Sequence, residues 1–225
     1  MINIIYEDNH LLVVEKPVNI PVQEDSSKDL DFLNILKKFI KKRDNKPGNV
    51  YLGLIHRLDR PVGGIMVFAK TSKCAQRLSK QVQNHEFKKQ YYAVTINEVK
   101  PHNGTFIDNL LKDEKNNTVK VDKKGKEAIL NYELIEYKNN MSLVKIDLKT
   151  GRSHQIRVQF SSRGYPLYGD HKYNLNVKTK SDIALFSHQI SFKHPITNEH
   201  ITFNLPIPEK YPWNTFKHLD ISKKK

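Results

Sequence analysis

The sequence has a single cysteine, Cys74, in 225 residues. One thiol excludes an internal disulfide and any metal site built from several cysteines. No apolar run is long enough to cross a bilayer, and the first residues lack the basic start and apolar middle of a secretory signal. We therefore expect a cytoplasmic protein without a membrane segment.

Acidic residues are scarce compared with basic ones. The chain has 24 Asp and Glu against 38 Lys and Arg, which gives a net charge of +14. Such an excess suits a polyanionic partner, most simply nucleic acid. A lysine-rich composition also produces ordinary solvated surfaces, so the charge favours nucleic acid without deciding the matter.

Periodicity predicts an α+β fold with mainly antiparallel strands. Helices are expected at residues 26–43 and from residue 72 to about 86. Strands are expected at residues 10–14, 65–69, 88–96, 128–134 and 144–148, and the last two should be joined at residues 138–140. Residues 101–126 suggest hairpins or a long surface excursion. No repeat or linker interrupts the chain, so we expect one domain over residues 1–225, with a mixed β-sheet flanked by helices and loops and no separate N-terminal RNA-binding domain.

The first candidate for chemistry is Asp59, which lies between Arg57 and Arg60 on a polar segment just before an apolar strand. A carboxylate at the mouth of a buried strand is fixed by the scaffold and exposed by the loop. Taken alone, the segment favours a plain surface ion pair at the entrance of a strand.

A second polar segment follows the strand at 144–148. It offers closely spaced cationic and amide donors suited to phosphates and base edges: Arg152, His154, Gln155 and Arg157. Ile156 and Phe160 share a helical face beside them. Each donor alone could be a satisfied structural group at a helix start. In the loop that follows, Asp170 is expected to cap a turn.

Together these segments resemble the RluA-type pseudouridine synthase family. The matching blocks occur in family order and cover roughly residues 6–210: 6–8 with 12–17, 56–59, 64–70, 89–91, 150–158, 164–170 and 185–195. In one departure, Val62 and Gly63 stand where family members commonly carry Thr-Ser, which removes two hydroxyls near the central acid.

The resemblance implies that uridine in RNA is converted to pseudouridine without a metal or organic cofactor. Asp59 matches the essential acid, Arg157 the arginine that pairs with it, and Tyr91 the tyrosine that stacks on the target base. Arg57 matches an arginine that enters the stack vacated by the flipped uridine, which suits a planar guanidinium. The further RNA-binding candidates are His56, Lys89, Arg152, His154 and Gln155.

Two other functions stay open. One is a catalytically silent RNA-binding protein on the same fold. The other is a carboxylate-based hydrolase or glycosidase, which usually needs a second acid or metal ions. The histidines fit no compact ligand set, so we expect no metal site. The expected partner is RNA, ribosomal or transfer, bound by a monomer.

Overall fold

The structure is a computed structural model that describes residues 2–25, 28–174 and 181–216. The chain divides into two compact units. Unit 1 comprises Met1–Lys88 and Gln189–Leu205, and unit 2 comprises Lys89–His188 and Pro206–Lys225. The single domain expected over residues 1–225 stays a prediction.

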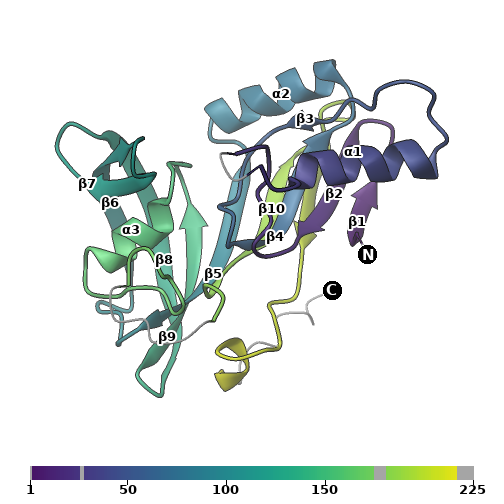
Figure 1. The fold of residues 1–225 in the computed structure, drawn as a ribbon. Coiled ribbons are helices and arrows are strands. Elements are labelled where there is room, and N and C mark those ends of the chain that lie inside the picture. The colour runs from purple at the N-terminus through teal and green to yellow at the C-terminus, as the bar shows by residue number, and fades with distance from the viewer. Residues whose placement is uncertain (1, 26–27, 175–180, 217–225) are drawn as a thin grey trace. The chain divides into compact units, whose positions relative to one another are not determined.

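Unit 1 is built on strands that pair side by side (Figure 1). Its strands are β1 (Ile4–Glu7), β2 (Leu11–Lys16), β3 (Gly53–Leu54), β4 (Gly63–Ala69), the end of β10 (Leu185–Lys193), and β11 (His200–Asn204). The order is β1-β2-β4-β10, with β3 paired to β4 and β11 to β10. Every residue of β4 is buried, as predicted for its apolar run.

Two helices complete unit 1, and both expected helices form with shifted ends. Helix α1 (Phe32–Arg43) begins six residues later than predicted, because the Asp31 carboxylate caps the helix by accepting from the Asn34 amide at 3.0 Å. Of the residues predicted before that cap, 26 and 27 lie outside the described part, and 28–31 are not helical. Helix α2 (Ser72–Gln83) starts at its expected cap, Thr71, and ends about three residues early.

Unit 2 is an antiparallel sheet in which β5 (Lys88–Ile96), β9 (Met141–Leu148), β8 (Lys126–Lys138), β6 (Asn103–Asp113) and β7 (Thr118–Val121) follow one another (Figure 1). Asn139 and Asn140, with φ of 52° and 57°, join β8 to β9. Positive φ at both central residues is typical of a tight hairpin turn. The expected hairpin at this point is therefore confirmed.

The two faces of the unit 2 sheet differ. On one face, Phe106 and Tyr132 contact Phe160 of α3 (Gln155–Ser161), with ring centroids 5.0 and 5.8 Å away. The other face carries Glu133, Lys145 and Asp147 together with the buried Leu143. A short 3-10 turn, η1 (Trp213–Thr215), follows near the end of the described chain. The predicted α+β class with mainly antiparallel pairing is confirmed.

Candidate active site

Asp59 lies on the turn that leads into β4. The Val62 amide closes this turn by donating to the Asp59 carbonyl at 3.0 Å. Leu58 and Val62 are buried, whereas Asp59 is half-buried and Arg57 is exposed. Buried neighbours thus fasten the turn while the acid reaches the surface, as the sequence predicts for a loop at the mouth of a buried strand.

A buried lysine holds the same turn. The Lys16 Nζ donates to the carbonyls of Pro17 at 2.8 Å, Arg60 at 3.1 Å and Val62 at 2.8 Å. Three carbonyl partners use all three donors of an ammonium, one more than a neutral amine offers. Burial lowers the pKa of Lys16 to about 7, and the charge of Asp59 opposes that shift. Lys16 therefore fixes the backbone directly after the candidate acid.

Sequence reasoning treated Lys16 only as the close of a strand and part of a family block. A stronger signal was present, because Leu12, Val14 and Lys16 alternate onto one face of β2. All three are completely buried. A lysine in line with two core residues indicates a side chain that must find its partners inside the protein.

The other residues of the central motif divide between surface and core. Arg60 forms an exposed ion pair with Asp29. His56 is turned inward, where its Nε2 accepts from the Val67 amide at 3.2 Å and its ring packs 5.4 Å from that of Phe87. This placement makes His56 part of the unit 1 core, and its expected contact with RNA stays a prediction.

In unit 2, α3 buries Arg157 against Asp170. The guanidinium donates twice to the carboxylate, from Nε at 2.8 Å and from Nη2 at 2.7 Å. Burial raises the pKa of Asp170, but the hydrogen bonds and charge of Arg157 outweigh it and hold that pKa below its usual value. The pair is therefore charged at neutral pH.

Asp170 also caps its own turn, as the sequence predicts. Its Oδ1 accepts from the amides of Lys172 at 3.0 Å and Tyr173 at 3.2 Å. The preceding Gly169 has a φ of 72°, and a Cβ there would collide with the carbonyl oxygen of Asp182. Only glycine fits this position without strain. The close approach of the Asp182 backbone therefore explains why a glycine precedes Asp170.

The expected pairing of Arg157 with Asp59 joins residues of different units. Asp59 belongs to unit 1, and Arg157 and Tyr91 belong to unit 2. Within its own unit, Arg157 has Asp170 as a bidentate partner, which the sequence did not predict. The Asp59–Arg157 pair stays a prediction.

The donors before α3 have different surroundings. Gln155 is buried, accepts from Thr150 Oγ1 at 2.8 Å and from the Arg152 amide at 3.0 Å, and donates to the Ile129 carbonyl at 3.1 Å. It thus fits the structural interpretation. Arg152 is exposed and donates to the Glu127 carbonyl at 2.8 Å. His154 contacts Tyr173, a residue that sequence reasoning missed and that no motif indicates.

Tyr91 and Lys89 lie on the α3 face of the unit 2 sheet. Tyr91 pairs with Ile146, which also pairs with Tyr132, and directly paired residues share a face. Tyr91 is buried, and burial lowers the pKa of Lys89. In unit 2 the structure therefore gathers Tyr91, Lys89 and the helix of Arg157 on one face, as a common site requires.

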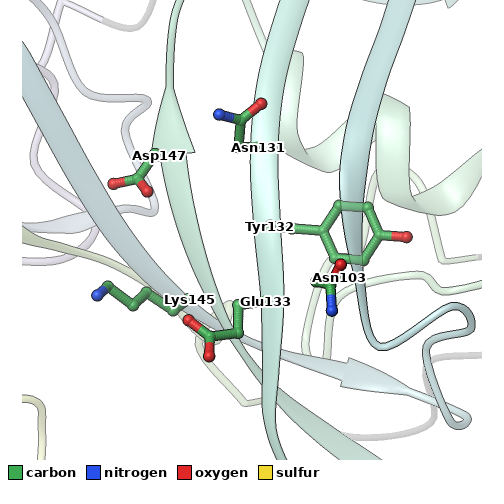
Figure 2. A pocket seen from close by; sticks show the side chains of 6 residues that line it. All are labelled: Asn103, Asn131, Tyr132, Glu133, Lys145 and Asp147. Atoms are coloured by element: carbon green, nitrogen blue, oxygen red, sulfur yellow. The ribbon is translucent and has the colours of Figure 1, made fainter.

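The opposite face of this sheet carries a shallow hollow of about 320 Å³ (Figure 2). Its lining residues, all on β6, β8 and β9, are Asn103, Asn131, Tyr132, Glu133, Lys145 and Asp147. Figure 2 shows the side chains of Glu133, Lys145 and Asp147 on one side of the sheet and Tyr132 pointing away from them. No predicted site residue lines this hollow, so we do not place the reaction there.

No described helix has the length and apolar character needed to span a membrane. Among the described residues, no cluster of three or more His, Cys, Asp or Glu side chains is arranged to hold a metal ion.

Comparison with known proteins gives consistent matches. The family model for RNA pseudouridylate synthase matches residues 10–162. A protein of Synechocystis sp. with the name uncharacterized RNA pseudouridine synthase is 32% identical over 219 residues, which cover 93% of this chain and 67% of the relative. Ribosomal large subunit pseudouridine synthase C of Vibrio vulnificus is 32% identical over 92% of this chain and 66% of its own length. The chain thus spans about two thirds of these relatives.

The fold has solved counterparts as well. Human RNA pseudouridylate synthase domain containing 4 superposes with a TM-score of 0.77 at 21% identity, covering 92% of this chain and 88% of that one. Human RNA pseudouridylate synthase domain containing 1 gives a TM-score of 0.75 at 21% identity, over 93% and 85% of the two chains. At 21% identity, the two solved structures support the fold alone. The family assignment rests on the family model and on the relatives that are 32% identical. The chain belongs to the RNA pseudouridylate synthase family, of the RluA type that its motifs resemble, and its class of enzyme is an isomerase.

Proposed function

We propose that this protein isomerises a uridine of RNA to pseudouridine with Asp59 as the reacting carboxylate. The observation that carries this proposal is the Asp59 turn, in which a buried lysine and two buried neighbours fasten the backbone and leave the acid at the surface. Membership of the family supplies the reaction class.

The reaction needs no oxidant or co-reactant. The bond from the sugar C1′ to the uracil N1 breaks, the base turns, and a bond from C1′ to C5 forms. The C5 hydrogen leaves as a proton, and N1 gains a proton. One ionised carboxylate can start this sequence by attacking C1′ or by taking the C2′ proton to give a glycal. Both routes are compatible with Asp59.

The other residues have supporting roles in this proposal. Tyr91 stacks on the target base and assists the loss of the C5 proton. Arg157 keeps a positive charge beside the reacting acid, which favours the ionised carboxylate. Arg57, which is exposed next to the acid, replaces the flipped uridine in its stack.

For the substrate, we propose structured RNA, with large-subunit ribosomal RNA as the first candidate. Support comes from the relative in Vibrio vulnificus that is named a ribosomal large subunit pseudouridine synthase. The cytoplasm, where ribosomal RNA is found in bacteria, is the proposed location, and a monomer is the proposed acting form.

The test is isomerisation by wild type and by Asp59→Asn on RNA carrying tritium at uracil C5, because each turnover releases that hydrogen to water. Wild type should release tritium, whereas Asp59→Asn should bind the RNA and release none. Asp44→Asn is a matched control, because Asp44 is a unit 1 carboxylate outside the Asp59 turn and pairs with Arg43. It should keep full activity.

Two results would count against the proposal. Substantial tritium release by pure Asp59→Asn would remove Asp59 from its role. RNA binding without release by wild type, on ribosomal and transfer RNA alike, would favour a silent RNA-binding protein instead.

A further inference from the structure

His154, one residue before α3, has an unusual backbone. Its φ of 51° and ψ of 20° lie in the left-handed region, and its side chain makes no capping hydrogen bond to the helix. Such a conformation costs energy in a residue with a Cβ and persists where the surroundings impose it. The His154 ring is therefore held by something other than the helix end.

The hydroxyl of Tyr173 is the contact that holds it. The Oη lies 2.6 Å from His154 Nδ1. The same oxygen accepts from the Val119 amide of β7 at 2.8 Å. One lone pair of the oxygen accepts from that amide, and we take the hydroxyl hydrogen to point at Nδ1, which then accepts. A neutral His154 ring consequently carries its proton on Nε2.

Tyr173 also contacts the candidate arginine. The Arg157 guanidinium carbon lies 5.1 Å from the centre of the Tyr173 ring, within the range of a cation–π contact. The Tyr173 amide donates to Asp170 Oδ1, the same oxygen that accepts from Arg157 Nη2 at 2.7 Å. One residue thus touches the histidine, the arginine and the carboxylate that pairs with the arginine.

We propose that Tyr173 is a positioning residue for RNA isomerisation, which fixes the His154 ring with its proton on Nε2 and supports the Arg157 guanidinium. The proposal rests on the proposed function, since it assigns His154 a contact with the RNA substrate. His154 then presents its Nε2–H to the RNA as a hydrogen-bond donor, and the ring already has the required orientation and tautomer before the RNA binds. Such preorganisation lowers the cost of binding.

A purely structural role for Tyr173 is the competing explanation. The ring packs against buried residues of β6, β7, β8 and α3, and the Tyr173 carbonyl accepts from Ser161 Oγ at 2.6 Å. Tyr173→Phe separates the two roles, because it keeps the ring, its packing and the contact with Arg157. It removes the hydroxyl, which contacts His154 Nδ1 and also accepts from the Val119 amide.

A double-mutant cycle in single-turnover isomerisation tests the coupling. Tyr173→Phe should lower the rate at subsaturating RNA roughly five- to tenfold, the worth of one hydrogen bond, and should cost nothing more in a His154→Ala background. Losses that multiply in the double variant would overturn the proposal. Tyr165→Phe is the matched control, because the Tyr165 hydroxyl of unit 2 bonds only the backbone of Lys100 in the described contacts.

A second experiment measures the protonation of the His154 ring directly and does not depend on enzyme activity. Nitrogen NMR of the His154 ring, assigned with His154→Ala, should show one tautomer protonated at Nε2 in wild type and in Tyr165→Phe. Tyr173→Phe should show a mixture of tautomers and a displaced titration, with a loss of melting temperature no larger than that of Tyr165→Phe, which also loses a hydroxyl bonded to the backbone. An identical His154 spectrum in wild type and Tyr173→Phe would overturn the positioning role. Failure of wild type to isomerise RNA would instead reject the proposed function, and the spectra would still decide whether Tyr173 fixes the ring.

Discussion

At the scale of single residues, two buried charged groups stand out, Arg157 and Lys16. The arginine on the α3 face was predicted to matter, but its bidentate partner Asp170 was expected only to cap a turn. The lysine that holds the Asp59 turn was not singled out at all. Hydrogen-bond partners that are 13 to 46 residues apart in sequence depend on tertiary contacts, which local patterns do not encode.

The pH dependence of stability should report Lys16. The folded-state pKa is lowered to about 7 from 10.5, mainly by burial. Between these values the unfolded chain binds a proton that the folded chain does not, so the unfolding free energy should rise with pH, by at most about 1.4 kcal/mol per unit from this site. Below pH 7 both states are charged and the slope vanishes.

Denaturant unfolding of wild type and Lys16→Met between pH 6 and 10 measures this contribution as the difference between the two curves. The difference should be flat below pH 7 and change above it. Parallel curves over the whole range would mean that the three carbonyls keep Lys16 charged.

Because deprotonation of Lys16 leaves one of its three carbonyl partners without a donor, the isomerisation rate of wild type should also fall on the alkaline side.

The Arg157–Asp170 pair should be costly to break from either end. Both side chains are almost completely buried, so removing one leaves an uncompensated charge. Asp170→Asn should lower the unfolding free energy by about 3 kcal/mol, and Arg157→Leu should lose activity as well as stability. The measurement is chemical denaturation, with activity followed for both variants.

A second pair in unit 2 supplies the control. Arg163 and Asp108 also form a two-bond ion pair, but the arginine is 30% exposed. Asp108→Asn should therefore cost about 1 kcal/mol or less. Equal losses for the two aspartate variants would contradict the importance given to burial.

At the scale of elements, periodicity located both long helices and the strands of unit 2, and the errors lie at the ends. Helix α1 was expected to begin at residue 26, and Asp29 and Asp31 are the two acidic residues that favour the N-terminal end of such a helix. Only Asp31 caps, since the Phe32 amide is already taken by the Pro21 carbonyl at 2.8 Å. A competition between two plausible caps is settled by tertiary hydrogen bonds that the sequence does not show.

Substitution of the two aspartates should separate the predicted and the observed start of α1. Asp31→Ala should lower the unfolding free energy by about 1 kcal/mol, the usual loss for an N-cap. Asp29→Ala removes an exposed ion pair with Arg60 and should cost less than 1 kcal/mol. Thermal or chemical denaturation of the two variants decides, and a larger loss for Asp29→Ala would contradict Asp31 as the N-cap of α1.

At the scale of the whole molecule, the net charge of +14 should dominate RNA affinity. Each phosphate contact releases counterions, so log K should fall by about 0.7–0.9 per contact for each tenfold rise in salt. Fluorescence anisotropy with one RNA from 50 to 400 mM salt measures the slope. Arg57→Ala should reduce that slope by less than one contact if Arg57 acts as a stacking wedge. A salt-independent affinity would show that the basic surface does not bind the RNA.

The sequence predicted which residues belong to the candidate site, but it did not predict which contacts hold them in place. Asp59, Tyr91 and Arg157 were found from motifs, and the structure assigns them to different units. Each of the three lies on a local element: Asp59 on the turn before β4, Tyr91 on β5 and Arg157 on α3. What holds each in place (Lys16, the sheet face and Asp170) is set by packing within each unit.

The interleaving of the units bears on how the protein is made on the ribosome. Unit 1 is discontinuous, since Gln189–Leu205 completes a unit that begins at the N-terminus. The end of β10 and all of β11 therefore leave the exit tunnel only after residues 89–188 of unit 2. The nascent chain must hold β4, in which every residue is buried in the finished fold, without the end of its partner β10 for a hundred residues of synthesis. Chaperone dependence during translation, rather than after it, is the expected cost of this chain order.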